Sequence, residues 1–171
     1  MKSVKIAFLD RDGVLNRSDI NKGYIGHAKD FKWISGAKKS IKYLRKKGFK
    51  IVIVSNQSGV ARGYFSIQDV YRLHKFLVMQ LKKINTKVDK IYFCPFHKDG
   101  IVKRYKKNSI LRKPKIGMFL KASSIWKIDK KKSFMIGDQK TDLEFTKKAK
   151  IKGYMFDQNN LLSFIKKKIN C

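Results

Sequence analysis

Residues 8–16 read FLDRDGVLN, and this stretch decides how the rest of the chain is interpreted. It continues an apolar run from Val4 that has the length and β-branched content of a buried strand. Asp10 and Asp12 stand two residues apart where that strand should end, at the edge where open α/β sheets form their sites. One carboxylate can act as a nucleophile while the other handles a proton, if a divalent cation offsets their charge. The same residues could also form a polar turn, because Asp and Gly are common turn residues.

Strands and helices are predicted to alternate along the whole chain. Apolar runs predict further strands at residues 50–54, 90–94, 133–136 and 153–156. Amphipathic patterns predict helices at residues 35–48, 66–81, 117–126, 140–149 and 160–169. The crossover rule then implies an α/β fold with a doubly wound, Rossmann-like parallel sheet of about five strands. No repeat or linker divides the chain, so we expect residues 1–171 to form a single domain without a large cap domain.

The charge of the chain is strongly positive. It has 42 Lys and Arg against 12 Asp and Glu, a formal net charge of +30, which should attract anions such as phosphorylated metabolites or nucleic acid. Most of the basic residues are Lys, and they are spread over every predicted helix, whereas nucleic-acid binders usually gather Arg and Lys on one face. We therefore favour a lysine-rich surface over a dedicated nucleic-acid interface. With 43% hydrophobic residues the chain can still build a core.

The cysteine content and the apolar runs indicate the compartment. Cys94 and Cys171 are the only cysteines, which fits a reducing environment and no disulfide framework. The first apolar run is too short for a signal-peptide core, and no stretch approaches the ~20 apolar residues of a membrane span. We expect a cytoplasmic, monomeric protein with no membrane partner.

Three further strand ends carry side chains suited to phosphate chemistry. Ser55 and Asn56 follow the second strand and can hold phosphate oxygens. The loop after the third strand supplies Arg112 and Lys113, whose charges suit a transferring phosphoryl group. The fourth strand ends in a Gly-Asp pair, with a second carboxylate one helical turn later, which suits a metal ligand and its support. Singly, each has an ordinary structural explanation, but together they supply a nucleophile, an acid, metal ligands and phosphate clamps.

Four ordered motifs carry a family resemblance: residues 10–16 (DRDGVLN), 55–63 (SNQSGVARG), 112–118 (RKPKIGM) and the Gly137-Asp138 pair. With them the sequence resembles the haloacid dehalogenase superfamily of phosphohydrolases. The resemblance is closest to its heptose-bisphosphate phosphatase and histidinol-phosphatase group, and it runs over essentially the whole chain. It implies a phosphatase that forms an aspartyl-phosphate intermediate.

The resemblance also implies roles for individual residues. Asp10 would be the nucleophile, and Asp12 would protonate the leaving oxygen and later activate water. Mg²⁺ would be held by the Asp10 carboxylate, the Asp12 backbone carbonyl and Asp138, with Asp142 in support. The transferring phosphate would be held by Ser55, Asn56, Arg112 and Lys113. Further substrate contacts would come from Asn56, Gln57, Ser58, Arg62 and Gln139.

The chain departs from this family pattern in the loop before Arg112. Many members of the group hold this loop with a structural zinc bound by a Cys-x-His pair and a Cys-x-Cys pair. Here Cys94 remains, but Phe96 takes the His position, and Ser109 and Leu111 take the later Cys positions. A single thiolate does not make a closed tetrahedral site, so we predict no structural zinc. The loop would instead be ordered by packing among its apolar residues: Phe96, Ile101, Tyr105 and Leu111.

A second departure bears on the substrate. Gln139 follows Asp138 where the heptose enzymes tend to carry Lys, so a cation beside the substrate is lost. The favoured substrate is a sugar phosphate, most closely the 7-phosphate of a heptose bisphosphate. Histidinol phosphate and a polynucleotide 3′-phosphate remain alternatives, the latter because of the charge. A non-enzymatic basic binding module is the third interpretation.

Overall fold

A computed structural model describes residues 2–18 and 24–169, and its core is one five-stranded parallel sheet. The strands have the spatial order β3-β2-β1-β4-β5. Their bounds are β1 (Ile6–Leu9), β2 (Lys50–Asn56), β3 (Lys90–Cys94), β4 (Phe134–Gly137) and β5 (Lys152–Met155). The expected doubly wound α/β fold is confirmed.

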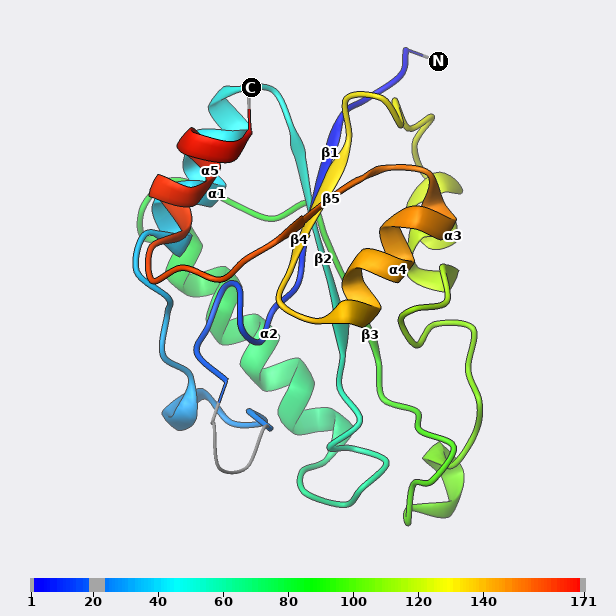
Figure 1. Cartoon of the computed structure of the whole chain (residues 1–171). Helices are drawn as coiled ribbons and strands as arrows, with labels where there is room; N and C mark the ends of the chain where they lie inside the picture. Colours follow the sequence, from blue (N-terminus) through cyan, green and yellow to red (C-terminus); the bar gives the residue numbers. More distant parts are fainter. Residues whose placement is uncertain (1, 19–23, 170–171) are drawn as a thin grey trace.

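Helices cover both faces of this sheet (Figure 1). On one face lie α1 (Ala37–Lys46), α2 (Ile67–Lys82) and α5 (Leu161–Lys168), and on the other α3 (Gly117–Ser123) and α4 (Lys140–Ala149). Each face has its own apolar cluster: Ile41, Leu73 and Phe164 belong to the first, and Met118 and Phe145 to the second. Such two-sided cover explains why the central strands are continuous apolar runs.

The strand order places two acidic strand ends together. β1 is the middle strand, and all four of its residues are buried. The chain runs outward from β1 through β2 to β3, and then returns to the other side of β1 with β4 and β5. In open α/β sheets, sites form where the strand order reverses. Here that point lies between the carboxyl ends of β1 and β4, which lead into Asp10 and Asp138.

The predicted bounds of most elements differ from the observed ones by one to three residues. β1 begins at Ile6, because Val4 forms an isolated bridge with Ile128. The helix predicted to reach Trp126 ends at Ser123, and the chain then turns toward that bridge. The short 3₁₀ helices η1 (Ala28–Asp30) and η2 (Lys103–Tyr105) were not predicted.

The loop between β3 and α3 is ordered by only part of the predicted packing. Phe96 and Tyr105 contact each other, with ring centroids 5.9 Å apart, and the Lys107 ammonium lies 4.0 Å from the centroid of Phe96. Ile101, however, is 79% exposed, and Leu111 packs against the α3–α4 cluster instead. The prediction is therefore wrong for Ile101 and Leu111, because the loop turns Ile101 outward and leads Leu111 toward α3.

Cys94 is fully buried at the end of β3. Its thiol donates to the Phe96 carbonyl at 3.7 Å, and burial raises the pKa of the thiol. Within the described ranges, three or more potential metal ligands come close together only in the acidic group described below. The absence of structural zinc stays a prediction.

Asp89 links α1 to the start of the sheet. Its carboxylate accepts from Arg45 at 2.6 Å, from Lys50 at 3.3 Å and from the Ile51 backbone N–H at 2.8 Å. The Asp89 side chain is only 8% exposed. Removing Asp89 would leave the buried Ile51 N–H without this acceptor and the partly exposed Arg45 and Lys50 without their shared counter-ion, which is costly.

We therefore predict that Asp89→Ala lowers the free energy of unfolding by about 2–3 kcal/mol. Urea denaturation followed by circular dichroism measures this change. Asp157→Ala removes an exposed carboxylate and should change the unfolding free energy by less than about 0.5 kcal/mol. Equal effects of the two substitutions would show that the Asp89 contacts contribute nothing specific.

Candidate active site

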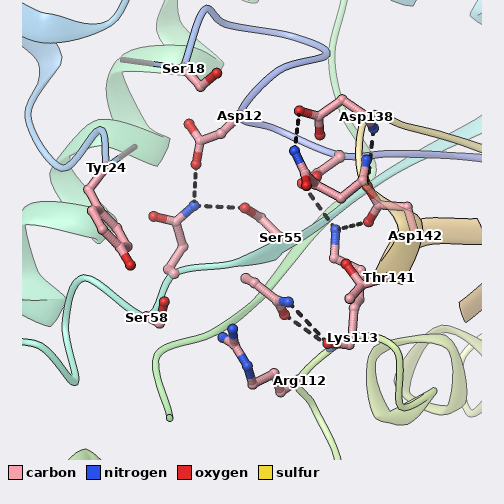
Figure 2. A pocket seen from close by; sticks show the side chains of 14 residues that line it. Asp12, Ser18, Tyr24, Ser55, Ser58, Arg112, Lys113, Asp138, Thr141 and Asp142 are labelled. Carbon is pink, nitrogen blue, oxygen red and sulfur yellow. Dashed lines mark hydrogen bonds and ion pairs between the residues drawn. The ribbon is translucent and has the colours of Figure 1, made fainter. Parts of the chain in front are cut away.

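A cavity of about 540 Å³ opens at the carboxyl edge of the sheet. It contains nearly every residue that the sequence proposed for the site: Asp10, Asp12, Ser55, Asn56, Gln57, Ser58, Arg112, Lys113, Asp138, Gln139 and Asp142. Figure 2 shows these side chains converging from the ends of separate strands and from α4. Arg62 is not among the lining residues.

Lys113 forms the centre of the charged part of the site. Its ammonium lies 3.1 Å from an Asp10 carboxylate oxygen and 2.6 Å from an Asp142 oxygen, and it donates to the Val54 carbonyl at 3.0 Å. The Lys113 side chain is only 2% exposed. Burial opposes its charge, but the two carboxylates outweigh this and raise the pKa of Lys113. A fixed ammonium is therefore held against Asp10.

The pKa of Asp10 is raised to about 8, above all by burial. Lys113 acts in the opposite direction, whereas the carboxylates of Asp142, Asp138 and Asp12 raise the pKa further. Burial also raises the pKa of Asp138. The protein's own cations thus leave this carboxylate group short of positive charge.

Asn56 holds the loop that delivers Lys113. Its amide oxygen accepts from the Lys113 backbone N–H at 3.0 Å, and its amide nitrogen donates to the Lys113 carbonyl at 3.2 Å. Both ends of the amide are therefore used on the backbone. This pairing fixes the loop after β3 against the end of β2.

Asp12 is held by a buried arginine to which the sequence motifs assign no role. Arg11 is completely buried and forms an ion pair with Asp12 at 2.9 Å. Asn16 and Gln57 each donate to the Asp12 carboxylate at 2.8 Å, and Gln57 also donates to Ser55 at 2.7 Å. Figure 2 shows the part of this chain that joins Asp12 to Ser55. The Asp12 carboxylate is 20% exposed and lines the cavity.

Arg62 does not line the cavity, and its charge acts on a second arginine, Arg112. One Arg62 nitrogen is 3.4 Å from a ring nitrogen of His97. Burial first, and then the charges of Arg112 and Arg62, lower the pKa of His97. Buried nitrogens of both arginines have no hydrogen-bond partner among the described residues. Of this pair, Arg112 lines the cavity and can meet a substrate.

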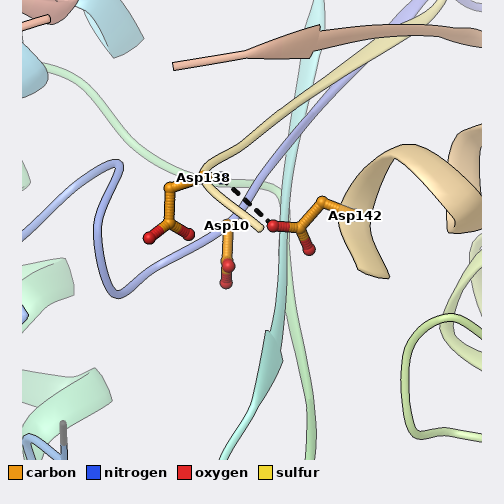
Figure 3. Close-up of side chains that lie close together, drawn as sticks. All are labelled: Asp10, Asp138 and Asp142. Carbon is orange, nitrogen blue, oxygen red and sulfur yellow. Dashed lines mark hydrogen bonds between the residues drawn. The ribbon is translucent and has the colours of Figure 1, made fainter. Parts of the chain in front are cut away.

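Three carboxylates form a group that could hold a cation (Figure 3). Asp10, Asp138 and Asp142 each offer an oxygen within 4.8 Å of the others. The Asp142 carboxylate forms an ion pair with Lys113 and accepts hydrogen bonds from the backbone N–H groups of Asp138 and Gln139. The latter two bonds cap the start of α4. A buried oxygen of Asp138 has no hydrogen-bond partner in the described part of the chain. Asp10 and Asp138 therefore fit a hard cation, and Asp142 fits a supporting role.

Gly13 allows Asp138 to approach β1. Its φ angle is +85°, and a Cβ atom at this position would collide with the Asp138 carboxylate. Glycine is the residue that meets both conditions without strain. The DRDG motif thus makes room for the carboxylate at the end of β4.

The cavity also has lining residues to which the sequence assigned no individual role: Ser18, Tyr24 and Thr141. Ser18 and Tyr24 belong to residues 17–27, a segment that its place after the first strand predicts at the rim of the site. The Tyr24 ring packs edge-on against Tyr64, with centroids 4.9 Å apart, and Tyr64 is 60% exposed. Both tyrosines lie in polar loops and have no periodic spacing, so the sequence did not predict that their rings contact each other.

His74 is a buried histidine in α2 that contacts the site through Arg11. Its ring nitrogen is 3.3 Å from an Arg11 nitrogen, and only 7% of the residue is exposed. Burial first, and then the Arg11 charge, lower the pKa of His74 to about 3. The folded protein therefore holds this imidazole neutral at pH values where the unfolded chain protonates it.

This difference predicts a loss of stability in acid. Below pH 6.5 the unfolded state binds one more proton at His74, so the contribution of this residue to stability falls as pH decreases toward 3. Between pH 7 and pH 5 the loss should be about 2 kcal/mol. His74→Gln keeps an acceptor for Arg11 but cannot be protonated. Between pH 7 and pH 5 the unfolding free energy of this variant should therefore fall by about 2 kcal/mol less than that of the wild type. Parallel curves for the two proteins, from urea denaturation at each pH, would contradict the assignment.

Comparisons with known proteins identify the family of this chain. The family model described as polynucleotide kinase 3 phosphatase matches residues 5–166. The D-glycero-beta-D-manno-heptose-1,7-bisphosphate 7-phosphatase of Rhodopseudomonas palustris is 39% identical over 160 residues, which are 94% of this chain and 87% of the relative. The Haemophilus influenzae protein of the same name is 42% identical over 148 residues, 86% of this chain and 78% of the relative.

A solved structure shows the same fold. The D,D-heptose 1,7-bisphosphate phosphatase from B. bronchiseptica, complexed with magnesium and phosphate, superposes with a TM-score of 0.80 at 24% identity. The alignment covers 97% of this chain and 88% of that one. With the carboxylate and lysine geometry described above, these matches confirm the resemblance seen in the sequence motifs. The chain belongs to the polynucleotide kinase 3 phosphatase family of haloacid dehalogenase-like phosphatases, together with the heptose-1,7-bisphosphate 7-phosphatases.

Proposed function

We propose that this phosphatase removes the 7-phosphate of a D-glycero-D-manno-heptose 1,7-bisphosphate. The observation that carries the proposal is the buried contact between Asp10 and Lys113 beside Asp12, at the floor of a cavity large enough for a sugar phosphate. Relatives at 39% and 42% identity over most of the chain bear the name of this activity. The phosphatase names of these relatives favour catalysis over the non-enzymatic binding module considered as the third interpretation.

In this proposal, Asp10 attacks the phosphorus atom and the bond to the leaving sugar oxygen breaks. Asp12 donates a proton to that oxygen, and then takes a proton from the water that hydrolyses the aspartyl-phosphate. Lys113 and Ser55 hold phosphate oxygens, and Arg112 meets the substrate from the cavity wall. Gln57 and Arg11 orient Asp12. Asn56 acts through the Lys113 backbone, and Ser58 and Gln139 line the part of the cavity open to the sugar.

We infer that Mg²⁺ is the cofactor and that Asp10, the Asp12 carbonyl and Asp138 hold it. The raised pKa of Asp10 and the unpartnered Asp138 oxygen support this assignment, because both indicate a missing positive charge. The structural relative that contains magnesium and phosphate supports it as well. When bound, Mg²⁺ would offset the charge of the carboxylates and of the incoming phosphate.

The first test is phosphate release by the purified protein with Mg²⁺ and with EDTA. Activity on heptose 1,7-bisphosphate should require Mg²⁺, and Asp10→Asn should lower it by on the order of 10³-fold or more, because the amide is a poor nucleophile. Asp30→Asn, a change at an exposed carboxylate, should leave the activity within about twofold of the wild type. Full activity of Asp10→Asn would refute the mechanism.

A second test concerns the position of Gln139. This exposed side chain lines the cavity and donates to Asp138 at 3.0 Å. Gln139→Lys should raise kcat/KM for the bisphosphate relative to the matching monophosphate by about threefold to tenfold, because a charge-assisted contact to the second phosphate is added.

Gln139→Met is the matched control, since it loses the same hydrogen bond without adding charge. It should leave the ratio of the two kcat/KM values near that of the wild type. If both variants changed the ratio equally, the charge at this position would have no part in the preference.

A polynucleotide 3′-phosphate is the second candidate substrate. The name of the matching family model and the net charge of +30 favour it. A 3′-phosphorylated oligonucleotide in the same assay, with histidinol phosphate beside it, separates the candidates. Strong loss of oligonucleotide turnover with added salt would support this substrate, and no binding at low salt would remove it.

Assembly and location remain predictions. Within the described residues, no helix has both the length and the apolar character that a membrane crossing requires. We propose, as the sequence suggested, a single-domain monomer that acts in the cytoplasm. The low cysteine content supports the reducing compartment, and light scattering on the purified protein measures the oligomeric state.

A further inference from the structure

A second cavity lies at the opposite edge of the sheet, where the strands begin. It has a volume of about 310 Å³ and lies far from the carboxyl ends of the strands that form the active site. Its described lining contains five lysines and no carboxylate. The lysines and aromatic residues that line it are Lys5, Lys131, Lys132, Lys152, Lys168, Phe49, Phe134 and Tyr154.

The floor of this lysine cavity is aromatic. The Phe134 ring packs edge-on against Phe49 at 5.2 Å and against Tyr154 at 5.7 Å. The Lys5 ammonium lies 4.3 Å from the centroid of Phe49, and that of Lys152 lies 5.0 Å from the centroid of Tyr154. Cation–π contacts thus hold two ammonium groups at the floor. An apolar floor also strengthens their attraction for an anion, because it lowers the local dielectric.

Ordinary surface effects explain only part of this arrangement. Lys168 lies in the last turn of α5, where the helix dipole favours cations. Lys5 and Lys152 instead lie at the beginnings of β1 and β5, outside any helix. Asp129 lies 4.0 Å from Lys132 but does not line the cavity. The five like charges repel one another, and a multiply charged anion would relieve that repulsion.

We propose that the lysine cavity binds a compact polyphosphate, either inorganic or the phosphate chain of a nucleoside triphosphate. A single phosphate would match about two of the five lysines, whereas linked phosphates can reach several ammonium groups at once. The ammonium groups of Lys5 and Lys152 lie over the rings of Phe49 and Tyr154, so these rings are not free to stack on a nucleobase. The phosphate chain is therefore the part of a nucleotide that the cavity recognises. This site is separate from the proposed phosphatase function and does not depend on it.

The test is calorimetric titration with tripolyphosphate, ATP and orthophosphate at 0.15 M salt without Mg²⁺. At this ionic strength charges more than about 8 Å away are largely screened. Tripolyphosphate and ATP should bind with similar affinity, and orthophosphate more weakly. The triple variant Lys5→Gln, Lys152→Gln, Lys168→Gln should weaken tripolyphosphate binding by about tenfold or more.

The control removes the same charge elsewhere. Lys75, Lys98 and Lys121 are exposed and lie outside the cavity, so changing all three to Gln should alter binding by less than about twofold. The corresponding Lys→Arg triple variant in the cavity should retain binding. In NMR spectra recorded during titration with tripolyphosphate, the backbone amide signals of Lys5 and Lys152 should shift. The Lys→Gln triple variant of the cavity should release phosphate from its substrate at the wild-type rate.

Several results would overturn the proposal. Equal weakening in the cavity and control variants would mean that the general charge of the surface binds the anion. Unchanged binding in the cavity variant, or amide shifts confined to residues such as Ser55 and Lys113, would place the anion in the active site. If the Gln variant failed to fold, loss of binding in the folded Arg variant would contradict charge recognition at this cavity.

Discussion

The ion contacts of the buried Lys113 ammonium hold the site together. Burying an ammonium group costs several kcal/mol of folding free energy unless hydrogen bonds and ion pairs replace its contacts with water. Here Asp10, Asp142 and the Val54 carbonyl provide these contacts. These partners come from the end of β1, from α4 and from β2. The contacts therefore exist only when the sheet and α4 are assembled, so folding itself places the ammonium against Asp10. The same carboxylate of Asp142 caps α4, which couples that helix to the charge of Lys113.

Arg11 forms a second buried charge on the other side of the site. It pairs with Asp12, contacts Gln57 at 3.0 Å and meets His74 from α2. Its guanidinium lies beneath the carboxylate that faces the cavity. Asp10 and Asp12 thus have different partners, although they are two residues apart: an ammonium with other carboxylates for one, and a guanidinium with amides for the other. That difference in surroundings is what two carboxylates need in order to serve as nucleophile and proton donor.

The sequence allowed prediction of the groups at each strand end, because parallel strands bring their carboxyl ends to one edge regardless of side-chain detail. It could not show which of those groups form hydrogen bonds with one another and which face the cavity. Asn56 was assigned to the substrate, but its amide is used by the Lys113 backbone, which depends on where a loop 57 residues later returns. Arg11 stands in a polar motif, and nothing local indicates that it is fully buried. Ile101 shows the reverse, an apolar residue that the loop turns into solvent.

The loop before Arg112 is positioned by contacts of its own backbone and side chains. Its backbone N–H groups at Ile101 and Val102 both donate to the Ala61 carbonyl, at 2.8 Å and 3.0 Å, in the loop that follows β2. Packing between Phe96 and Tyr105, with Lys107 close to the Phe96 ring, adds contacts within the loop itself. Asn56 then holds the far end at Lys113. Because Ala61 holds the middle of this segment and Asn56 holds its far end, the position of Arg112 and Lys113 depends on the end of β2 and the loop that follows it.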